Sequence, residues 1–370
     1  MNGNSGRTSD LRPAFRTVGQ KAGFAGVLLL LLLSPAVFQK FLPPRESLYM
    51  AAPWRLGAYP YIHDQIFSET NDVDIAFMGD SPLWWGIDTP HVQAELSRRL
   101  GRPAVVRSLC WTWSGVDAFY FIGKDLLEHR HVRMIVFCDM TGGTSQTAHY
   151  QAMHFFRFGD DPQAMQGLNW RGRTSFYASA ILGMPRNLLS ALRPDLPAIP
   201  SKEVGWADIR GVPNPATRLG SLPVRTVETG VYSDYSPTNR PDPASVCVES
   251  ENVAAFKFAG QPVSNTQAAF ARKIGELARE HQVNLVYLHL PFSSEADESV
   301  ITESADWRQV FHADISLLGI PGTKLLGPLA PEERKKLFCD FQHLNENGQI
   351  YFTSVITDRL LQLYEDQARH

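Results

Sequence analysis

Residues 73–81 read VDIAFMGDS, a short apolar run followed by a polar turn, and this stretch decides how the rest of the chain is interpreted. The run Val73–Met78 has the length and the β-branched and aromatic content of a buried strand. Gly, Asp and Ser at 79–81 are turn-forming residues. A helix is predicted over Thr89–Leu100, where apolar residues recur every four positions. The stretch therefore begins a strand–turn–helix unit, with a serine just beyond the carboxyl end of the strand.

The same alternation of strands and helices continues along most of the chain. The predicted strands are 104–109, 134–138 and 283–290, and the predicted helices are 116–129, 263–281 and 345–365. Such alternation favours an α/β fold in which helices cover both faces of a parallel sheet. In sheets of this kind, ligands bind beyond the carboxyl ends of the strands. The serine at the end of the first strand therefore has the position of a functional residue.

Between residues 141 and 261 the alternation stops, because eleven prolines divide the segment into short pieces. A structureless loop of this length is uncommon inside a compact domain. We interpret residues 141–261 as an insertion with local structure, packed over the strand ends as a cap or a substrate-binding surface. The alternative is a surface excursion without a role in function.

The amino-terminal part has the pattern of a membrane anchor. Residues 1–21 carry four basic side chains and one acidic one, and residues 22–38 form an uncharged apolar run. This pattern predicts a signal-anchor that crosses the inner membrane once, with residues 1–21 in the cytoplasm. Residues 45–370 are then predicted to form a periplasmic domain. The alternatives are a signal peptide, cleaved at the small residues 34–36, or a buried helix of a soluble protein.

The composition is that of a globular protein. The chain has 370 residues, of which 44% are hydrophobic and 20% charged, and its formal net charge is −3. These values exclude a disordered chain and give no sign of the basic surface that nucleic-acid binders carry. Four cysteines are too few for a disulfide scaffold, and none lies in a Cys-x-x-Cys pair, which argues against a zinc ribbon or a thioredoxin-type site. Cys110 and Cys138 are predicted to be buried thiols, although pairing in an oxidising compartment stays open.

Two short motifs can carry chemistry. The first contains Ser81, whose hydroxyl is a weak nucleophile that needs a base within hydrogen-bond reach. The second lies at residues 339–348 and reads CDFQHLNENG. Asp340 and His343, three residues apart on a turn before a helix, can face one site, with the histidine as base and the aspartate as its partner. The structural alternatives are an ordinary turn at the serine, and an Asx turn with a helix cap from Asn345 or Asn347.

Together the motifs resemble those of the SGNH (GDSL-type) hydrolase superfamily: GDS follows the first strand, and DxxHLNxxG precedes the last helix. The likeness covers about residues 70–140 and 262–368 and leaves the insertion unmatched. The phrases GDSPLWWGID and SLCWTWSGVDAFYF, and a strand ending in LPF, resemble one membrane-anchored, extracytoplasmic branch most closely. That branch acts in O-acylation of cell-surface polysaccharides and includes alginate O-acetyltransferase accessory proteins and relatives of the D-alanine transfer protein.

The resemblance implies a flavodoxin-like three-layer fold with five parallel strands and with no metal or organic cofactor. It implies Ser81 as nucleophile, His343 as base and Asp340 as the partner of the histidine. The backbone amides of Ser81 and Gly115 are implied as the oxyanion hole. The family usually adds an asparagine after the third strand, where this chain has Asp139 instead. The expected oxyanion hole therefore consists of two amides, and the loss of one donor costs about 10²-fold in rate.

The same resemblance implies the reaction and the partners. It implies O-acyl transfer, with acetyl as the expected group, or ester hydrolysis on a surface polysaccharide, and a membrane-bound O-acyltransferase as the acyl donor. Trp84, Trp85 and Trp113 follow the first two strands and are predicted to contact sugar rings, with packing in the core as the alternative. The contrasting hypothesis is a non-catalytic glycan-binding or scaffold subunit of a membrane O-acyltransferase complex. No nucleic-acid partner is expected.

Overall fold

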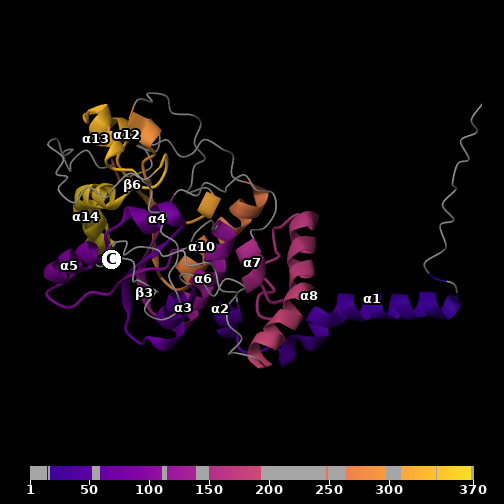
Figure 1. The fold of residues 1–370 in the computed structure, drawn as a ribbon. Coiled ribbons are helices and arrows are strands. Elements are labelled where there is room, and N and C mark those ends of the chain that lie inside the picture. Colours follow the sequence, from indigo (N-terminus) through magenta and orange to yellow (C-terminus); the bar gives the residue numbers. More distant parts are fainter. Residues whose placement is uncertain are drawn as a thin grey trace, which may run out of the picture.

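A parallel sheet organises the fold (Figure 1). In the described part of the chain, five parallel strands lie in the order β2-β1-β3-β5-β6, and β4 adds a short antiparallel segment beside β6. The strands are β1 Val73–Met78, β2 Val106–Ser108, β3 Val132–Cys138, β4 Cys247–Val248, β5 Asn284–Leu288 and β6 Ile315–Gly319. The computed structural model describes residues 15, 17–51, 59–110, 115–138, 150–192, 247–248, 264–296, 310–338 and 340–367. Without β4 the strand order along the chain is 2-1-3-4-5, which is the flavodoxin-like arrangement.

Helices cover both faces of this sheet, so the predicted three-layer α/β fold is confirmed (Figure 1). On one face α6 (Val116–His129) packs against α10 (Asn265–Glu280). On the other face α5 (Thr89–Leu100) packs against α14 (Glu346–Gln367). All six residues of β1 are buried, as expected for a central strand covered on two sides.

Short helices fill the connections between the main elements. They are η1 Gln39–Phe41, α2 Ser47–Ala51, α3 Tyr59–His63, η2 Asp64–Ser68, α4 Ser81–Gly86, η5 Ser293–Ala296, α12 Gly322–Leu325 and α13 Pro331–Lys335. Of these, α4 follows β1 after Gly79 and Asp80, and a longer loop connects α13 with α14. These two connections carry the residues of both sequence motifs.

The amino-terminal helix α1 (Val18–Phe38) extends away from the domain (Figure 1). It begins four residues before the uncharged run, because Thr17 and Gln20 form a reciprocal capping box at its start. Residues 27–33 are all exposed and all apolar. The helix, with η1 behind it, is long and apolar enough to cross a membrane, as predicted.

The insertion is described in part. The helices in its described ranges are α7 (Tyr150–Phe155) and α8 (Trp170–Leu192). The expectation that the insertion covers the strand ends is wrong for this part, because α7 packs on α6 while α8 packs on α7, α2 and α1. The physical reason is a cluster of aromatic rings, in which Phe176 of α8 contacts Phe121 of α6 and Phe270 of α10. Residues 156–169 connect these two helices, and the rest of the insertion, apart from β4, lies outside the described ranges.

Candidate active site

Ser81 is the first residue of α4, three residues after the end of β1. Gly79 makes the tight connection possible, since a Cβ atom there would lie 2.6 Å from Leu83 and 2.7 Å from the Cys138 sulfur. Asp80 is the extended N-cap residue, and Pro82 occupies the first turn, where proline fits. Local sequence thus places the serine at the carboxyl edge of the sheet, as the motif predicted.

The loop between α13 and α14 carries Asp340 and His343. A β-bridge between Phe338 and Leu344 closes this loop at its base. Asn345 ties it to the helix behind: its side chain accepts a hydrogen bond from the Gly348 N–H at 3.0 Å and donates one to a carbonyl in the preceding turn at 2.8 Å. The helix cap that the sequence suggested as an alternative is therefore present, and it holds the candidate catalytic loop in place.

The structure brings the two motifs together across 262 residues of sequence. His343 Nε2 lies 2.7 Å from Ser81 Oγ, and His343 Nδ1 lies 2.7 Å from Asp340 Oδ2. When Nδ1 carries the proton, it donates to Asp340 and leaves Nε2 free to accept the serine proton. Ser81 is buried and Asp340 is partly exposed, so this series of hydrogen bonds runs from the interior of the domain toward solvent. This is the geometry of a nucleophile, a base and an orienting carboxylate.

Asp340 is held in its charged form. Partial burial acts to raise its pKa, but hydrogen bonds from the Gln342 N–H and from the side chain and N–H of His343 outweigh that effect and hold the pKa below its usual value. The two backbone N–H groups donate to Oδ1 at 2.9 and 2.8 Å, which leaves Oδ2 for the imidazole. The same Asp340 carboxylate therefore forms both the predicted Asx turn and the predicted contact with the histidine.

The predicted oxyanion donors stand beyond the ends of neighbouring strands. Ser81 begins α4 after β1, and Gly115 is the N-cap residue of α6 after β2. Gly115 has no room for a side chain, because a Cβ atom would lie 2.7 Å from Asp117 Oδ1 and 3.1 Å from Gln267 Oε1. Asp139, at the expected third position, lies outside the described residues. Its neighbour Cys138 is a buried thiol whose sulfur lies 3.4 Å from Asp80 Oδ1.

The three candidate tryptophans have different surroundings. Trp85 is partly exposed, and its ring centroid lies 5.2 Å from that of His343, so it borders the site. Trp84 is only 2% exposed and belongs to the hydrophobic core. The interpretation of Trp84 as a sugar-contacting residue is therefore corrected to core packing, because consecutive residues of a helix point in different directions. Trp113 lies outside the described residues.

Phe341 is a site residue that sequence reasoning missed. It lies between Asp340 and His343, and its side chain is 66% exposed. Its ring is stacked parallel to that of Phe292, with 6.4 Å between the centroids, and Ser293 donates two hydrogen bonds to its carbonyl. The signal available in the sequence was an aromatic residue inside an otherwise polar motif. The two rings offer a flat apolar surface beside the triad.

A buried pair of side chains fixes the loop that carries Phe292. Buried His289 and buried Glu295 lie 3.0 Å apart, and the Phe292 N–H donates to the same carboxylate at 3.2 Å. This pair orders the turn after β5, on which Phe341 rests. The pair therefore holds Phe292 where its ring stacks on that of Phe341.

No family model matches this chain, and no curated protein matches it. The class of protein is therefore defined by the fold and the site alone. It is an α/β protein in which a serine, a histidine and an aspartate are joined by hydrogen bonds at the carboxyl edge of a flavodoxin-like parallel sheet.

Proposed function

We propose that this chain is a membrane-anchored, extracytoplasmic serine O-acyltransferase or esterase of the SGNH type that acts on a cell-surface polysaccharide. The observation that carries the proposal is the hydrogen-bonded chain from Ser81 through His343 to Asp340, with 2.7 Å at each step. The resemblance of both sequence motifs to the superfamily supports it. Acetyl is the expected acyl group.

In the first half-reaction, Ser81 Oγ attacks the carbonyl carbon of the acyl donor while His343 Nε2 takes the hydroxyl proton. Asp340 keeps the proton on Nδ1 and stabilises the imidazolium that forms. The amides of Ser81 and Gly115 are the proposed donors to the oxyanion. When the tetrahedral intermediate collapses, the bond to the donor breaks, His343 returns the proton to the leaving group, and the acyl group stays on Ser81.

In the second half-reaction, a sugar hydroxyl or water gives its proton to His343 and attacks the acyl-serine. The bond to Ser81 Oγ then breaks, and the serine regains its proton from the imidazolium. Transfer and hydrolysis share every residue and differ only in the acceptor. Trp85 and Phe341 provide aromatic faces on which a sugar ring can stack, which favours a sugar hydroxyl as the acceptor.

The proposed location follows from the amino-terminal segment. Basic residues before α1 favour a cytoplasmic amino end and an inner-membrane anchor, which leaves the α/β domain in the periplasm. A polysaccharide on its way to the cell surface passes through that compartment. A membrane-bound O-acyltransferase is the proposed donor of the acyl group.

The direct test is intact-mass analysis of the full chain in detergent after treatment with a fluorophosphonate. An activated serine displaces fluoride and gains one phosphonyl adduct. We expect one adduct on the wild type, none on Ser81→Ala, and much slower labelling of His343→Ala. Ser68→Ala, which removes an exposed hydroxyl elsewhere, is the matched control and should label like the wild type. No adduct on the wild type would contradict an activated serine and favour the non-catalytic hypothesis.

A second measurement separates transfer from hydrolysis. The acyl-serine formed from a chromogenic acetyl ester is offered an acetylatable polysaccharide. A transferase gives acetylated polymer and less free acetate, whereas an esterase gives free acetate only. Acetylated polymer from Ser81→Ala protein would contradict the acyl-serine mechanism.

A further inference from the structure

We propose that the outward face of α8 lies on the surface of the membrane that α1 crosses, so that lipid holds the domain at two places. The inference rests on the part of the proposed function in which α1 spans a membrane. It says what covers an apolar helix face that has no part in the proposed catalysis.

The outward face of α8 is apolar and open. Leu182 and Leu192 are both 77% exposed, and Leu188 is also exposed. Ala178 and Pro185 are exposed at the intervening turns, so the residues recur every three or four positions on one side of the helix. The opposite side carries the buried residues of α8, such as Phe176, and packs on the domain. An apolar stripe of this length on a water-facing helix is a mark of an interaction surface.

The first turn of α8 has the chemistry of a lipid headgroup region. Trp170 is 72% exposed, and the Arg171 guanidinium lies 5.5 Å from its ring centroid. Arg173 is also exposed. Tryptophan and arginine beside exposed leucines are typical of helices that lie in the plane of a bilayer surface. This composition favours lipid over another protein as the occupant.

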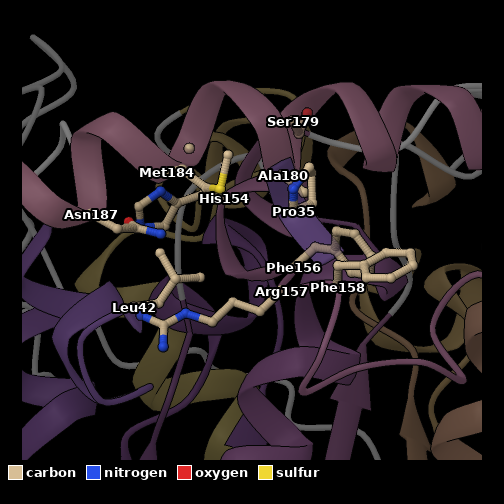
Figure 2. A pocket seen from close by; sticks show the side chains of 11 residues that line it. Pro35, Leu42, His154, Phe156, Arg157, Phe158, Ser179, Ala180, Met184 and Asn187 are labelled. Atoms are coloured by element: carbon tan, nitrogen blue, oxygen red, sulfur yellow. The ribbon is translucent and has the colours of Figure 1, made fainter. Parts of the chain in front are cut away.

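The position of α8 relative to α1 agrees with contact between α8 and lipid. The Tyr177 hydroxyl donates to the Leu32 carbonyl near the carboxyl end of α1. Beside this contact, Pro35 and Leu42 from the anchor segment share a small pocket with Ala180, Met184 and other residues of α8 (Figure 2). In Figure 1, α8 runs crosswise to α1 along the border of the domain from which α1 extends. When α1 stands across a bilayer, α8 therefore lies near its surface.

Buried charges fix the segment that links α1 to the domain. Arg45 pairs with Asp125 of α6 and with Asp161, the latter at 2.7 Å. Arg157 donates to the carbonyls of Pro43 and Pro44, and so ties the same segment to the residues after α7. Because these contacts connect the linker with the domain at several points, α8 cannot swing freely away from the exit of α1.

The test uses the full chain reconstituted in nanodiscs that contain a phospholipid with a diazirine on its acyl chain. After photolysis, lipid adducts are mapped to peptides by mass spectrometry. We expect adducts on α1 and on residues 178–192 of α8, and none on α10. The triple variant Leu182→Asn, Leu188→Asn, Leu192→Asn should lower the α8 adducts about tenfold or more, since one buried leucine corresponds to about that factor in an equilibrium. Its α1 adducts should stay unchanged.

Ile350→Asn is the matched control, because it removes an exposed aliphatic side chain from α14 and should change neither set of adducts. Adducts on α1 without adducts on α8 would overturn the inference and leave the span intact. A dimer detected by light scattering that the triple variant abolishes, with α8 free of lipid adducts, would assign the face to a second copy and also overturn it. Absence of adducts on α1 would refute the span itself.

Discussion

The hydrogen bonds around Asp340 allow a prediction for Asp340→Asn. In the wild type, Oδ1 accepts the N–H groups of Gln342 and His343, and Oδ2 accepts the imidazole Nδ1–H at 2.7 Å. In the variant, the amide oxygen keeps the two backbone hydrogen bonds and the amide NH₂ group faces Nδ1. The imidazole then carries its proton on Nε2, where it cannot take the proton of Ser81. The turn stays folded while the base is lost.

The expected loss is large, because the wrong tautomer of the histidine in a serine triad lowers the rate by about 10⁴-fold. This factor corresponds to about 5 kcal/mol in the activation free energy. The assay is the rate of fluorophosphonate labelling of the full chain, measured together with the melting temperature. The melting temperature should change little, since both backbone donors keep their acceptor.

Asp358→Asn is the matched control, because it changes an exposed carboxylate that pairs with Arg99 on the surface. It should label at the wild-type rate. Labelling of Asp340→Asn within about tenfold of the wild type would refute the assignment of Asp340 as the partner of His343, since the tautomer argument requires a loss near 10⁴-fold.

Three further predictions concern stability, each measured by denaturant unfolding. Gly79→Ala should destabilise by about 1–3 kcal/mol, because the added methyl group overlaps packed side chains. Asp161→Ala should destabilise by about 3–5 kcal/mol, since it leaves the Arg45 charge without one of its two buried partners. Burial acts to raise the pKa of Asp74, but hydrogen bonds from Arg102 and other donors hold it below its usual value. This carboxylate therefore stabilises the fold above about pH 4, and its contribution is lost as the pH falls through the lowered pKa.

Each of these predictions has a contradicting outcome. A neutral Gly79→Ala would mean that the turn after β1 has more space than the structure shows. An Asp161→Ala variant as stable as the wild type would mean that solvent reaches the ion pairs. For Asp74, the comparison is Asp74→Asn, which should lose less stability on acidification than the wild type; equal losses would rule out this carboxylate as the source.

The sequence predicted those elements whose ends carry clear signals. A helix was predicted in the region of Thr89–Leu100, and the structure has one there: Asp88 caps its start and Gly101, with a φ of +63°, ends it. The helix over Val116–His129 was also predicted with the observed bounds. In both, amphipathic spacing and tertiary packing favour the same limits, and the first helix also has a side-chain cap from Asp88.

Other elements lacked such signals. β6 (Ile315–Gly319) has only five residues and was not found from its residues, although the family resemblance implied a fifth strand. α8 was missed because Pro185 lies inside the helix and suggested a break. Tertiary contacts with α1, α2 and α7 support that helix, and such contacts are not visible in a local pattern.

The site was predicted in part. The order of the motifs along the chain led to Ser81, Asp340 and His343, and their hydrogen bonds agree with the roles proposed for them. Local sequence did not distinguish Trp84 from Trp85, since only the packing of α4 decides which ring is buried. Phe341 was overlooked because its exposure depends on the fold of the loop.

The division of the triad between the two ends of the chain has a consequence for biosynthesis. Ser81 emerges early, whereas His343 is made near the end, and the helix behind it is fastened to the start of the domain by Gln349, which donates to the Ile87 carbonyl at 3.1 Å. Until that last helix docks, the serine has no base. If the proposed mechanism holds, a ribosome-bound or half-translocated chain therefore has no activated serine, and acyl transfer to Ser81 begins only after the last helix has docked.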